Sequence, residues 1–325
     1  MKMKKVTGLL AMTVAAVMAM TGCGGNDAAD ESTGNKGYHI GIIQQMEHGS
    51  LDQATKGFED KLTELLGDKV KFDYQNAQGE QTNCTTIATK FVSNDVDLIM
   101  ANATTALQAA AAATGDIPIV GTSVTDYKTA GVVDSNEKPG RNVTGVSDLA
   151  PVDQQIQLLM KLVPDTKKVG IVYCSAEPNS AYQAKLAEAE LDKEGIAWAE
   201  FTAADSNEVQ SVVTKAVGEC DALYIPTDNT IANNTEIVKN VAVPAGIPVV
   251  TGEEGMCSGC GLATLSISYY DLGVTTGKMA AKILKGEANI SEMPVEYTDA
   301  TPKYNASICD QLGITPLDGY EAIDG

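Results

Sequence analysis

The sequence predicts an α/β protein built from two doubly wound units of parallel sheet. From Tyr38 onward, short runs rich in β-branched residues alternate with amphipathic stretches. This alternation continues to Val120 and starts again at Pro151. The length of 325 residues suits about two domains of roughly 150 residues each. Repeated strand–helix alternation places helices on both faces of a parallel sheet, so two such units are expected end to end.

The first unit is expected to alternate strictly between strand and helix. Its helix at 50–66 has Leu51, Ala54, Phe58 and Leu62 on one face, which is the pattern of a helix packed on a sheet. The expected strands are 38–44, 70–74, 98–101 and 117–120, and the expected helices are 50–66, 81–92 and 106–113.

The second unit repeats the same order, and a smaller block of two strands and one helix follows it. The expected helices are 151–162, 181–193, 207–217 and 270–285, and the expected strands are 168–173, 197–202, 222–225, 248–251 and 262–267. In open α/β sheets, ligands bind in the crevice at the carboxyl ends of the strands. Two units facing each other would therefore surround one small molecule with strand-end loops.

Composition and motifs exclude several functions. The chain has 23 Lys+Arg against 43 Asp+Glu, and Arg141 is its only arginine, so it lacks the clustered cations that a nucleic-acid partner needs. Two isolated histidines and one Cys-x-x-Cys do not make a metal site. Without a P-loop, a G-x-G-x-x-G motif or a nucleophile–base spacing, we expect no cofactor and no enzyme activity.

The first residues predict export and a lipid anchor. Three lysines in residues 1–5 precede the uncharged stretch 6–20, which is typical of a signal peptide and too short for a permanent span. Thr21-Gly22-Cys23 resembles the bacterial lipobox, so we predict a signal peptide at 1–22, lipidation of Cys23 and a polar tether at 23–37. The alternative is an ordinary secretory signal with a chance cysteine. The anchored protein would sit on the outer face of the cytoplasmic membrane.

The remaining cysteines are even in number, which allows up to three disulfides in an exported protein. The sequence does not decide between disulfides and free thiols for Cys84, Cys174, Cys220, Cys257, Cys260 and Cys309. The pair in Cys257-Ser258-Gly259-Cys260 is expected to precede a strand instead of starting a helix after one. This placement favours a disulfide or two free thiols over a redox motif.

Polar residues gather at the expected strand ends and form the candidate ligand site. They are Glu47, His48, Ser50, Asn76, Thr104, Thr105, Ser123, Thr125, Asn179, Asp228, Glu253 and Glu254. Each has a simpler interpretation as a helix N-cap or a solvated loop residue, and His48 as a loop residue beside an N-cap. The two interpretations are compatible, because a helix start with hydroxyls and free amides also binds a carboxylate.

The scarcity of arginine limits how this site could hold a ligand carboxylate. With Arg141 in a turn, a guanidinium clamp on a ligand carboxylate is not expected. We expect Thr104-Thr105 and Ser123/Thr125 to supply hydroxyls and helix-start amides in its place. Asp228, Glu253 or Glu254 could pair with a ligand ammonium, and the tyrosines Tyr127, Tyr173 and Tyr182 could stack on either an indole or a sugar.

Six segments spread over the mature chain resemble the solute-binding lipoproteins of bacterial ABC importers, in the class that includes tryptophan- and other aromatic-amino-acid-binding proteins. They are IGIIQQMEHGSLDQATKGF (40–58), DYQNAQGE (73–80), GTSVTD (121–126), KPGRNVTGVSDL (138–149), ALYIPTDNTIA (222–232) and YYDLGVTTGKMAAKILKGE (269–287). The resemblance implies the type I periplasmic-binding fold, with two Rossmann-like lobes joined by three crossings. It places one lobe at 38–146 plus 263–293 and the other at 147–262 plus 294–325.

The resemblance also implies a function. The protein would capture a small solute by hinge closure of the lobes, as a monomer that docks on an ABC permease served by ATPase subunits. Tryptophan, tyrosine or phenylalanine is the favoured ligand. Two departures lie in the presumed pocket, His48-Gly49-Ser50 and Asn102-Ala103-Thr104-Thr105, so the ligand need not be the family's. The alternatives are a sugar- or nucleoside-binding protein of the same fold, a sensory ligand-binding lipoprotein and, least favoured, an exported hydrolase.

Overall fold

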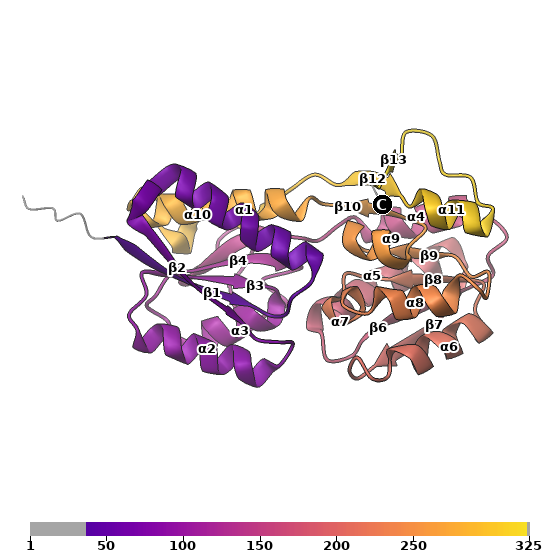
Figure 1. Cartoon of the computed structure of the whole chain (residues 1–325), viewed down its shortest axis with the longest axis horizontal. Coiled ribbons are helices and arrows are strands. Elements are labelled where there is room, and N and C mark those ends of the chain that lie inside the picture. The colour runs from indigo at the N-terminus through magenta and orange to yellow at the C-terminus, as the bar shows by residue number, and fades with distance from the viewer. Residues whose placement is uncertain (1–36, 324–325) are drawn as a thin grey trace, which may run out of the picture. The chain divides into compact units, whose positions relative to one another are not determined.

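The computed structural model describes residues 37–323 and contains two sheets, each at the centre of one lobe (Figure 1). The predicted signal peptide, the predicted lipidation site Cys23 and nearly all of the predicted tether lie outside the described residues. None of the helices in the described part of the chain has the length and apolar character needed to cross a membrane.

The first lobe is built on a six-stranded sheet in the order β11-β5-β4-β3-β1-β2, and all of its strands are parallel. The strands are β1 (Tyr38–Gln44), β2 (Val70–Asn76), β3 (Leu98–Asn102), β4 (Ile119–Val124), β5 (Val143–Ser147) and β11 (Glu296–Tyr297). The helices are α1 (Gly49–Leu66), α2 (Gln81–Ser93), α3 (Thr104–Ala113) and α10 (Tyr269–Leu284), with short 3-10 turns at Gly67–Lys69 and Ile290–Glu292.

The second lobe is built on a seven-stranded sheet in the order β13-β12-β10-β9-β8-β6-β7, in which only the β10–β12 pair is antiparallel. The strands are β6 (Lys168–Cys174), β7 (Ala197–Ala203), β8 (Ala222–Ile225), β9 (Val249–Thr251), β10 (Ala263–Ser266), β12 (Thr301–Tyr304) and β13 (Glu321–Ala322). The helices are α4 (Val152–Leu162), α5 (Pro178–Glu194), α6 (Val209–Glu219), α7 (Asn229–Ala232), α8 (Thr235–Ala242), α9 (Glu254–Cys260) and α11 (Ala306–Leu312).

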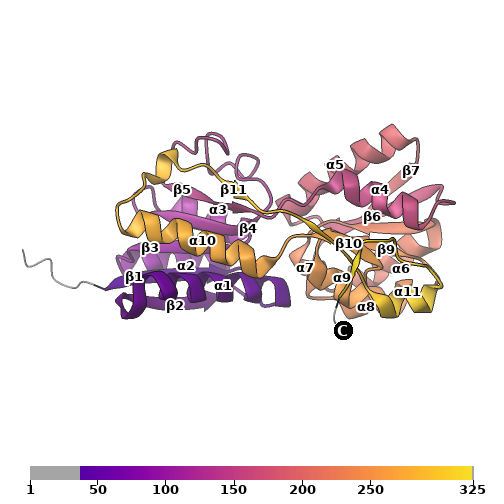
Figure 2. The same ribbon diagram turned by 90° about the horizontal axis from the view of Figure 1, so that it is seen from above.

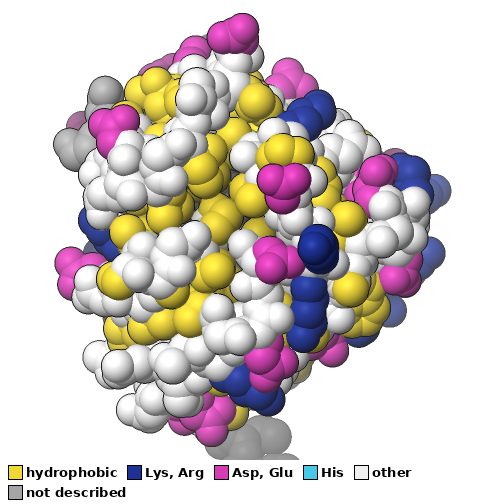
Figure 3. All heavy atoms as spheres, turned by 90° about the vertical axis from the view of Figure 1, so that its right-hand side faces the viewer, with side chains coloured by type: hydrophobic (Ala, Val, Ile, Leu, Met, Phe, Trp, Pro, Cys, Tyr) yellow, Lys and Arg dark blue, Asp and Glu magenta, His cyan; other side chains and the backbone are white. Residues whose placement is uncertain are grey.

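Alternation along the strands fills both faces of each sheet. In β1, Ile42 packs with α1 and α10, whereas its neighbour Ile43 packs on the opposite face with α2 and α3. In β6, Ile171 packs with α4 and α5, and Val172 with α6, α8 and α9. Figure 3 shows one face of the second lobe, where hydrophobic side chains lie among charged side chains of both signs.

Two glycines bring α1 and α10 side by side (Figures 1 and 2). A Cβ built on Gly57 would lie 2.1 Å from the carbonyl oxygen of Tyr270. A Cβ built on Gly273 would lie 2.0 Å from the carbonyl oxygen of Ala54. Both distances are far below any allowed contact, so the two helix backbones approach through glycine. This packing attaches α10 to the first lobe although it follows a strand of the second.

The predicted fold class is confirmed, and the chain crosses between the two sheets after β5, after β10 and after β11. Two lobe boundaries need correction. Residues 263–266 belong to the second sheet, because β10 pairs with β9 and β12 there. Residues 296–297 belong to the first sheet, because β11 pairs with β5. The segment that returns to the first lobe after β10 therefore runs from α10 to β11, and not over residues 263–293.

The elements predicted from periodicity are present, with shifted ends. The strand expected at 117–120 is β4 at 119–124, and the helix expected at 106–113 is α3, which begins at Thr104. The described elements that the prediction lacked are β5, β11, β12, β13, α7, α8, α9 and α11. One consequence concerns Cys257 and Cys260. They precede the strand β10, as expected, but they lie in the helix α9, which follows β9 and which the prediction lacked.

Candidate functional site

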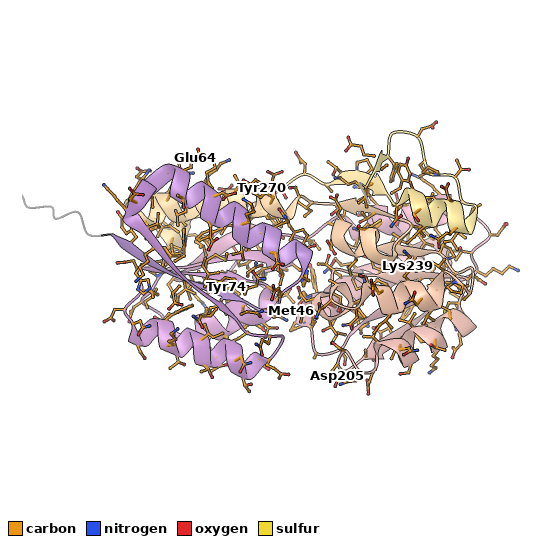
Figure 4. All side chains as sticks on the ribbon, viewed as in Figure 1. Met46, Glu64, Tyr74, Asp205, Lys239 and Tyr270 are labelled. Atoms are coloured by element: carbon orange, nitrogen blue, oxygen red, sulfur yellow. The ribbon has the colours of Figure 1, made fainter. Side chains whose placement is uncertain are left out.

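The strand-end loops of the two lobes enclose a cavity of about 800 Å³. From the first lobe, the loops after β1 and β2 and the helix α3 line it. From the second lobe, the loops after β6 and β7 and the helix α7 line it. In Figure 4, Met46 lies at the end of the first lobe nearest the second, and Asp205 lies in the second; both side chains line the cavity. The expected position of a ligand, at the carboxyl ends of the strands, therefore holds a cavity.

A second, much smaller cavity of about 10 Å³ lies beside the first. Thr104 and Thr125 of the first lobe and Asn179 and Tyr182 of the second lobe line it. Pro178 lines both cavities, so the two spaces are adjacent. The smaller space is about the size of one water molecule.

Hydrogen bonds connect the lobes beside these cavities. The Ser50 hydroxyl donates to Oε2 of Glu253 at 2.6 Å. The Gln183 amide donates to the Thr125 hydroxyl at 3.2 Å, and His48 Nε2 lies 3.2 Å from Oδ1 of Asn229. The lobes are thus in direct polar contact through residues of both strand-end loop sets.

The helix starts at the site differ in how their free amides are satisfied. No side chain caps α1 at His48, α3 at Ala103 or α5 at Glu177. By contrast, Asp228 caps α7 and Glu253 caps α9. Uncapped first-turn amides carry the positive end of the helix dipole and attract an anion. The start of α3 is therefore a natural place for a ligand carboxylate.

Backbone strain marks the same region of the first lobe. Ala103 has φ 87° and Ser123 has φ 55°, although neither residue is glycine. Ala103 follows β3 directly and Ser123 lies near the end of β4. Non-glycine residues in this region cost about 1–3 kcal/mol and gather at ligand sites. The strain turns the chain so that Thr104 begins α3 beside the smaller cavity.

The predicted site residues fall into three groups. Glu47, Asn76 and Thr105 line the larger cavity. Thr104, Thr125 and Asn179 line the smaller one. The others line neither cavity in this structure; they are His48, Ser50, Ser123, Asp228, Glu253 and Glu254.

Asp228 and Glu253 are engaged with the backbone of the second lobe. Asp228 is 1% exposed and accepts from the amides of Cys174 at 2.6 Å and Ile231 at 2.8 Å. Burial and the nearby Glu177 carboxylate raise the pKa of Asp228 to about 8. Glu253 accepts from the amides of Gly255 and Met256, each at 2.6 Å, as well as from Ser50. Glu254 pairs with Lys303 at 3.0 Å.

Glu177 is a buried cavity residue that the sequence pattern does not single out. It is 3% exposed and lines the larger cavity. Its carboxylate accepts from the backbone amides and side chains of Asn229 and Thr230, at 2.7–3.0 Å. It thereby ties the loop after β6 to the start of α7. Glu177 lies between the expected strand 168–173 and the expected helix 181–193, but its role depends on the four-residue helix α7, which has no sequence signal of its own.

Asp148 forms a buried junction where two crossings meet. It lies just after β5, and its carboxylate accepts from the Thr125 hydroxyl at 3.1 Å and from the Tyr269 hydroxyl at 3.0 Å. Tyr269 begins α10, on the next crossing. Burial raises the pKa of Asp148 to about 6. Since Thr125 also accepts from Gln183, the junction is linked to the contact between the lobes.

Two of the three tyrosines that were expected to stack on a ligand lie away from the cavities. Tyr127 is fully buried and donates to the carbonyl of Val146, and Tyr173 donates to Glu200, so only Tyr182 of the three expected stacking residues lines a cavity.

The six cysteines of the described chain are buried, free thiols. Burial raises the pKa of Cys257 and Cys260, which does not suit a reactive thiol pair. Within residues 37–323, no cluster of three His, Cys, Asp or Glu could hold a metal ion.

Two Rossmann-like lobes with a polar cavity at their facing strand ends define a protein that encloses a small molecule. The family described as "ABC transporter substrate binding protein" matches residues 39–319, and the chain belongs to this family. The predicted family resemblance is therefore confirmed. Members of this family bind substrates for transport and work outside the cytoplasm.

Individual relatives agree with this assignment. The chain is 40% identical over 309 residues to a tyrosine-binding protein of Clostridioides difficile, a match that covers 92% of this chain and 89% of the relative. A Streptococcus pneumoniae ABC domain solved in complex with L-Trp is 36% identical, with a TM-score of 0.85 over 88% of this chain and 100% of that one. A ligand-free, open substrate-binding protein with adhesive properties from Clostridium difficile is 38% identical, with a TM-score of 0.69 over 88% and 99% of the two chains.

Proposed function

We propose that this protein captures an aromatic L-amino acid outside the cell membrane and delivers it to an ABC permease driven by ATPase subunits. The observation that carries the proposal is the interlobe cavity of about 800 Å³, bordered by uncapped helix starts and lined by carboxylates without a cation. A zwitterion suits such a wall, because helix amides hold its carboxylate and acidic side chains hold its ammonium. The relatives named for tyrosine and solved with L-Trp support the aromatic class.

Within this cleft we assign the α-carboxylate to the start of α3. Thr104 and Thr105 begin this helix without a capping side chain, and they line the smaller and the larger cavity respectively. Glu47 lines the larger cavity as an exposed carboxylate and adds to the negative charge of the cleft, which attracts a ligand with an ammonium group. Met46 and Pro178 offer an apolar surface to the aromatic ring.

A thermal-shift screen tests the ligand class. The purified protein is screened against the twenty amino acids, a set of sugars and a set of nucleosides. A ligand at 100 times its dissociation constant should add about 2.7 kcal/mol to the free energy of unfolding. We expect a rise in melting temperature with tyrosine, tryptophan or phenylalanine. A rise with a sugar or nucleoside alone would overturn the proposed ligand, and turnover of an added ester or peptide would contradict a binding-only role.

We also propose that Cys23 carries the lipid anchor after removal of residues 1–22. The lipobox-like Thr21-Gly22-Cys23 and the polar residues that follow it support this assignment. Replacement of Cys23 by serine should release the protein from the membrane fraction and abolish incorporation of a labelled fatty acid. Retention of the label in Cys23→Ser would contradict it.

A further inference from the structure

Asn179, which lines the smaller cavity, has a buried amide oxygen without a hydrogen-bond partner. It is the second residue of α5, is 6% exposed and lines the smaller cavity. Its Nδ2 lies 3.2 Å from each of three acceptors, on Glu177, Ser180 and the Thr227 backbone. These contacts identify which amide atom is the nitrogen, because a carboxylate and a carbonyl can only accept. Oδ1 is therefore held in place as an acceptor, and it has no partner.

The walls around Asn179 offer further acceptors and no cation. Asp126 lines the same small cavity. In the larger cavity Gln45 is 3% exposed, and its Oε1 also lacks a partner. None of the residues that line the two cavities is a lysine, arginine or histidine. A buried acceptor without a donor is costly, so this cleft favours a ligand that brings donors of its own.

We propose that Oδ1 of Asn179 accepts an N–H from the primary ammonium of the bound ligand and so selects amino compounds against carboxylic acids that lack the amine. This inference rests on the proposed function and assigns one atom of the site to one group of its ligand. An ammonium has three donors and no acceptor, and the smaller cavity offers it the Asn179 oxygen, the Asp126 carboxylate and threonine hydroxyls that can accept. The smaller cavity, at about 10 Å³, suits one group of the size of water or ammonium.

The position of Thr104 supports the same assignment. Thr104 shares the smaller cavity with Asn179 and begins the uncapped helix α3. A ligand whose carboxylate meets the α3 amides can therefore place its neighbouring ammonium at the smaller cavity, beside Asn179. An α-amino acid carries these two charged groups on one carbon. The site thus discriminates by both groups together, with Asn179 responsible for the nitrogen.

The test compares one ligand pair on two proteins. Dissociation constants of L-tyrosine and of its desamino analogue, 3-(4-hydroxyphenyl)propanoate, are measured by calorimetry, with displacement titrations for the weaker ligand. In the wild-type protein, the dissociation constant of the desamino analogue divided by that of L-tyrosine reports what the amino group contributes to binding. In Asn179→Leu this ratio should fall about tenfold or more, because a hydrogen bond to a charged group is lost.

A purely structural role for Asn179 gives a different result. Loosening of the Glu177 loop would weaken both ligands by the same factor and leave the ratio unchanged, which would overturn the inference. Asn240→Leu is the matched control, because this exposed asparagine of α8 lines neither cavity and its substitution should leave the ratio unchanged. Asn179→Ala also removes the acceptor and introduces no bulky apolar group, so it should show the same fall in the ratio and serves where the leucine variant is unstable. An unchanged ratio in Asn179→Ala would also overturn the inference.

The same titration separates this inference from the proposed function. A wild-type protein that binds no aromatic amino acid would overturn both. A wild-type protein that binds L-tyrosine, with the same ratio in Asn179→Leu, would overturn the role of Asn179 alone and leave the proposed function standing.

Discussion

The hydroxyl of Ser50 in the first lobe donates a hydrogen bond of 2.6 Å to the Glu253 carboxylate in the second. Ser50 is 7% exposed and Glu253 is 3% exposed, so water replaces this bond poorly. The same carboxylate caps α9 through the amides of Gly255 and Met256. The bond therefore joins the start of α1 to a rigid helix start in the other lobe, and it exists only while the lobes are together.

Ser50→Ala should weaken ligand binding, because the closed state loses a hydrogen bond to a charged group. Removal of such a bond costs about 1.5–3 kcal/mol, so the dissociation constant should rise by about tenfold or more. Calorimetry with the identified ligand measures this change. Ser93→Ala, on the exposed end of α2, is the control and should bind as the wild type does. Unchanged affinity in Ser50→Ala would show that the bond does not contribute to closure.

Asp148 should make the stability depend on pH. Burial raises its folded pKa from 3.8 to about 6, so the folded protein binds this proton more tightly than the unfolded chain does. The contribution of Asp148 to the free energy of unfolding should therefore fall as pH rises from about 4 to 6, by up to about 3 kcal/mol. Above pH 6 it should stay constant.

Denaturant unfolding of the wild type and of Asp148→Asn at several pH values measures this contribution. The difference between the two curves isolates Asp148 from Asp228, whose raised pKa acts in the same direction. Asp68→Asn, at an exposed position, is the matched control and should follow the wild type. Parallel curves for the wild type and Asp148→Asn between pH 4 and 6 would contradict the prediction.

The contact between α1 and α10 should tolerate no added methyl group. Gly273→Ala would place a Cβ against the carbonyl oxygen of Ala54, which is backbone and cannot rotate away. Overpacking of this kind typically costs 1–3 kcal/mol, and we expect about 3 kcal/mol or more here. In α6, Gly218 has nothing within 4 Å of an added Cβ, so Gly218→Ala should stabilise the protein by about 0.5–1 kcal/mol. Equal effects of the two substitutions, measured by chemical unfolding, would rule out the packing argument.

Sequence periodicity predicted the two sheets well because their central strands are buried on both faces. Runs such as Leu98–Asn102 and Ala222–Ile225 are fully buried and are recognisable as strands from composition alone. The strand β5 was missed because Val143–Ser147 contains Gly145 and polar residues, and its burial comes from its neighbours β4 and β11. The helices α7 and α9 are four and seven residues long, too short for a periodic pattern.

The sequence predicts which loops form the candidate site, but not what each of their side chains contacts. The strand-end positions of Glu47, Thr104 and Asn179 follow from the alternation of strands and helices, and the structure places all three on cavity walls. The partners of Asp228 and Glu253 could not be predicted in this way. They depend on the short helices α7 and α9, whose free amides attract these carboxylates.

A substitution of Asp228 tests whether this residue caps a helix or contacts the ligand. As the cap of α7, Asp228→Asn should lower the free energy of unfolding at about pH 4 by about 1 kcal/mol or more, because an amide oxygen can replace only one of the two oxygens that accept from Cys174 and Ile231. This loss should shrink as pH rises, because burial raises the pKa of Asp228 to about 8 and the asparagine avoids a buried charge. The ratio of the dissociation constants of L-tyrosine and its desamino analogue should change little, since Asp228 lines neither cavity. Direct contact with the ligand ammonium predicts the reverse, a ratio that collapses with little loss of stability. Chemical unfolding and calorimetry on the same preparation decide between the two.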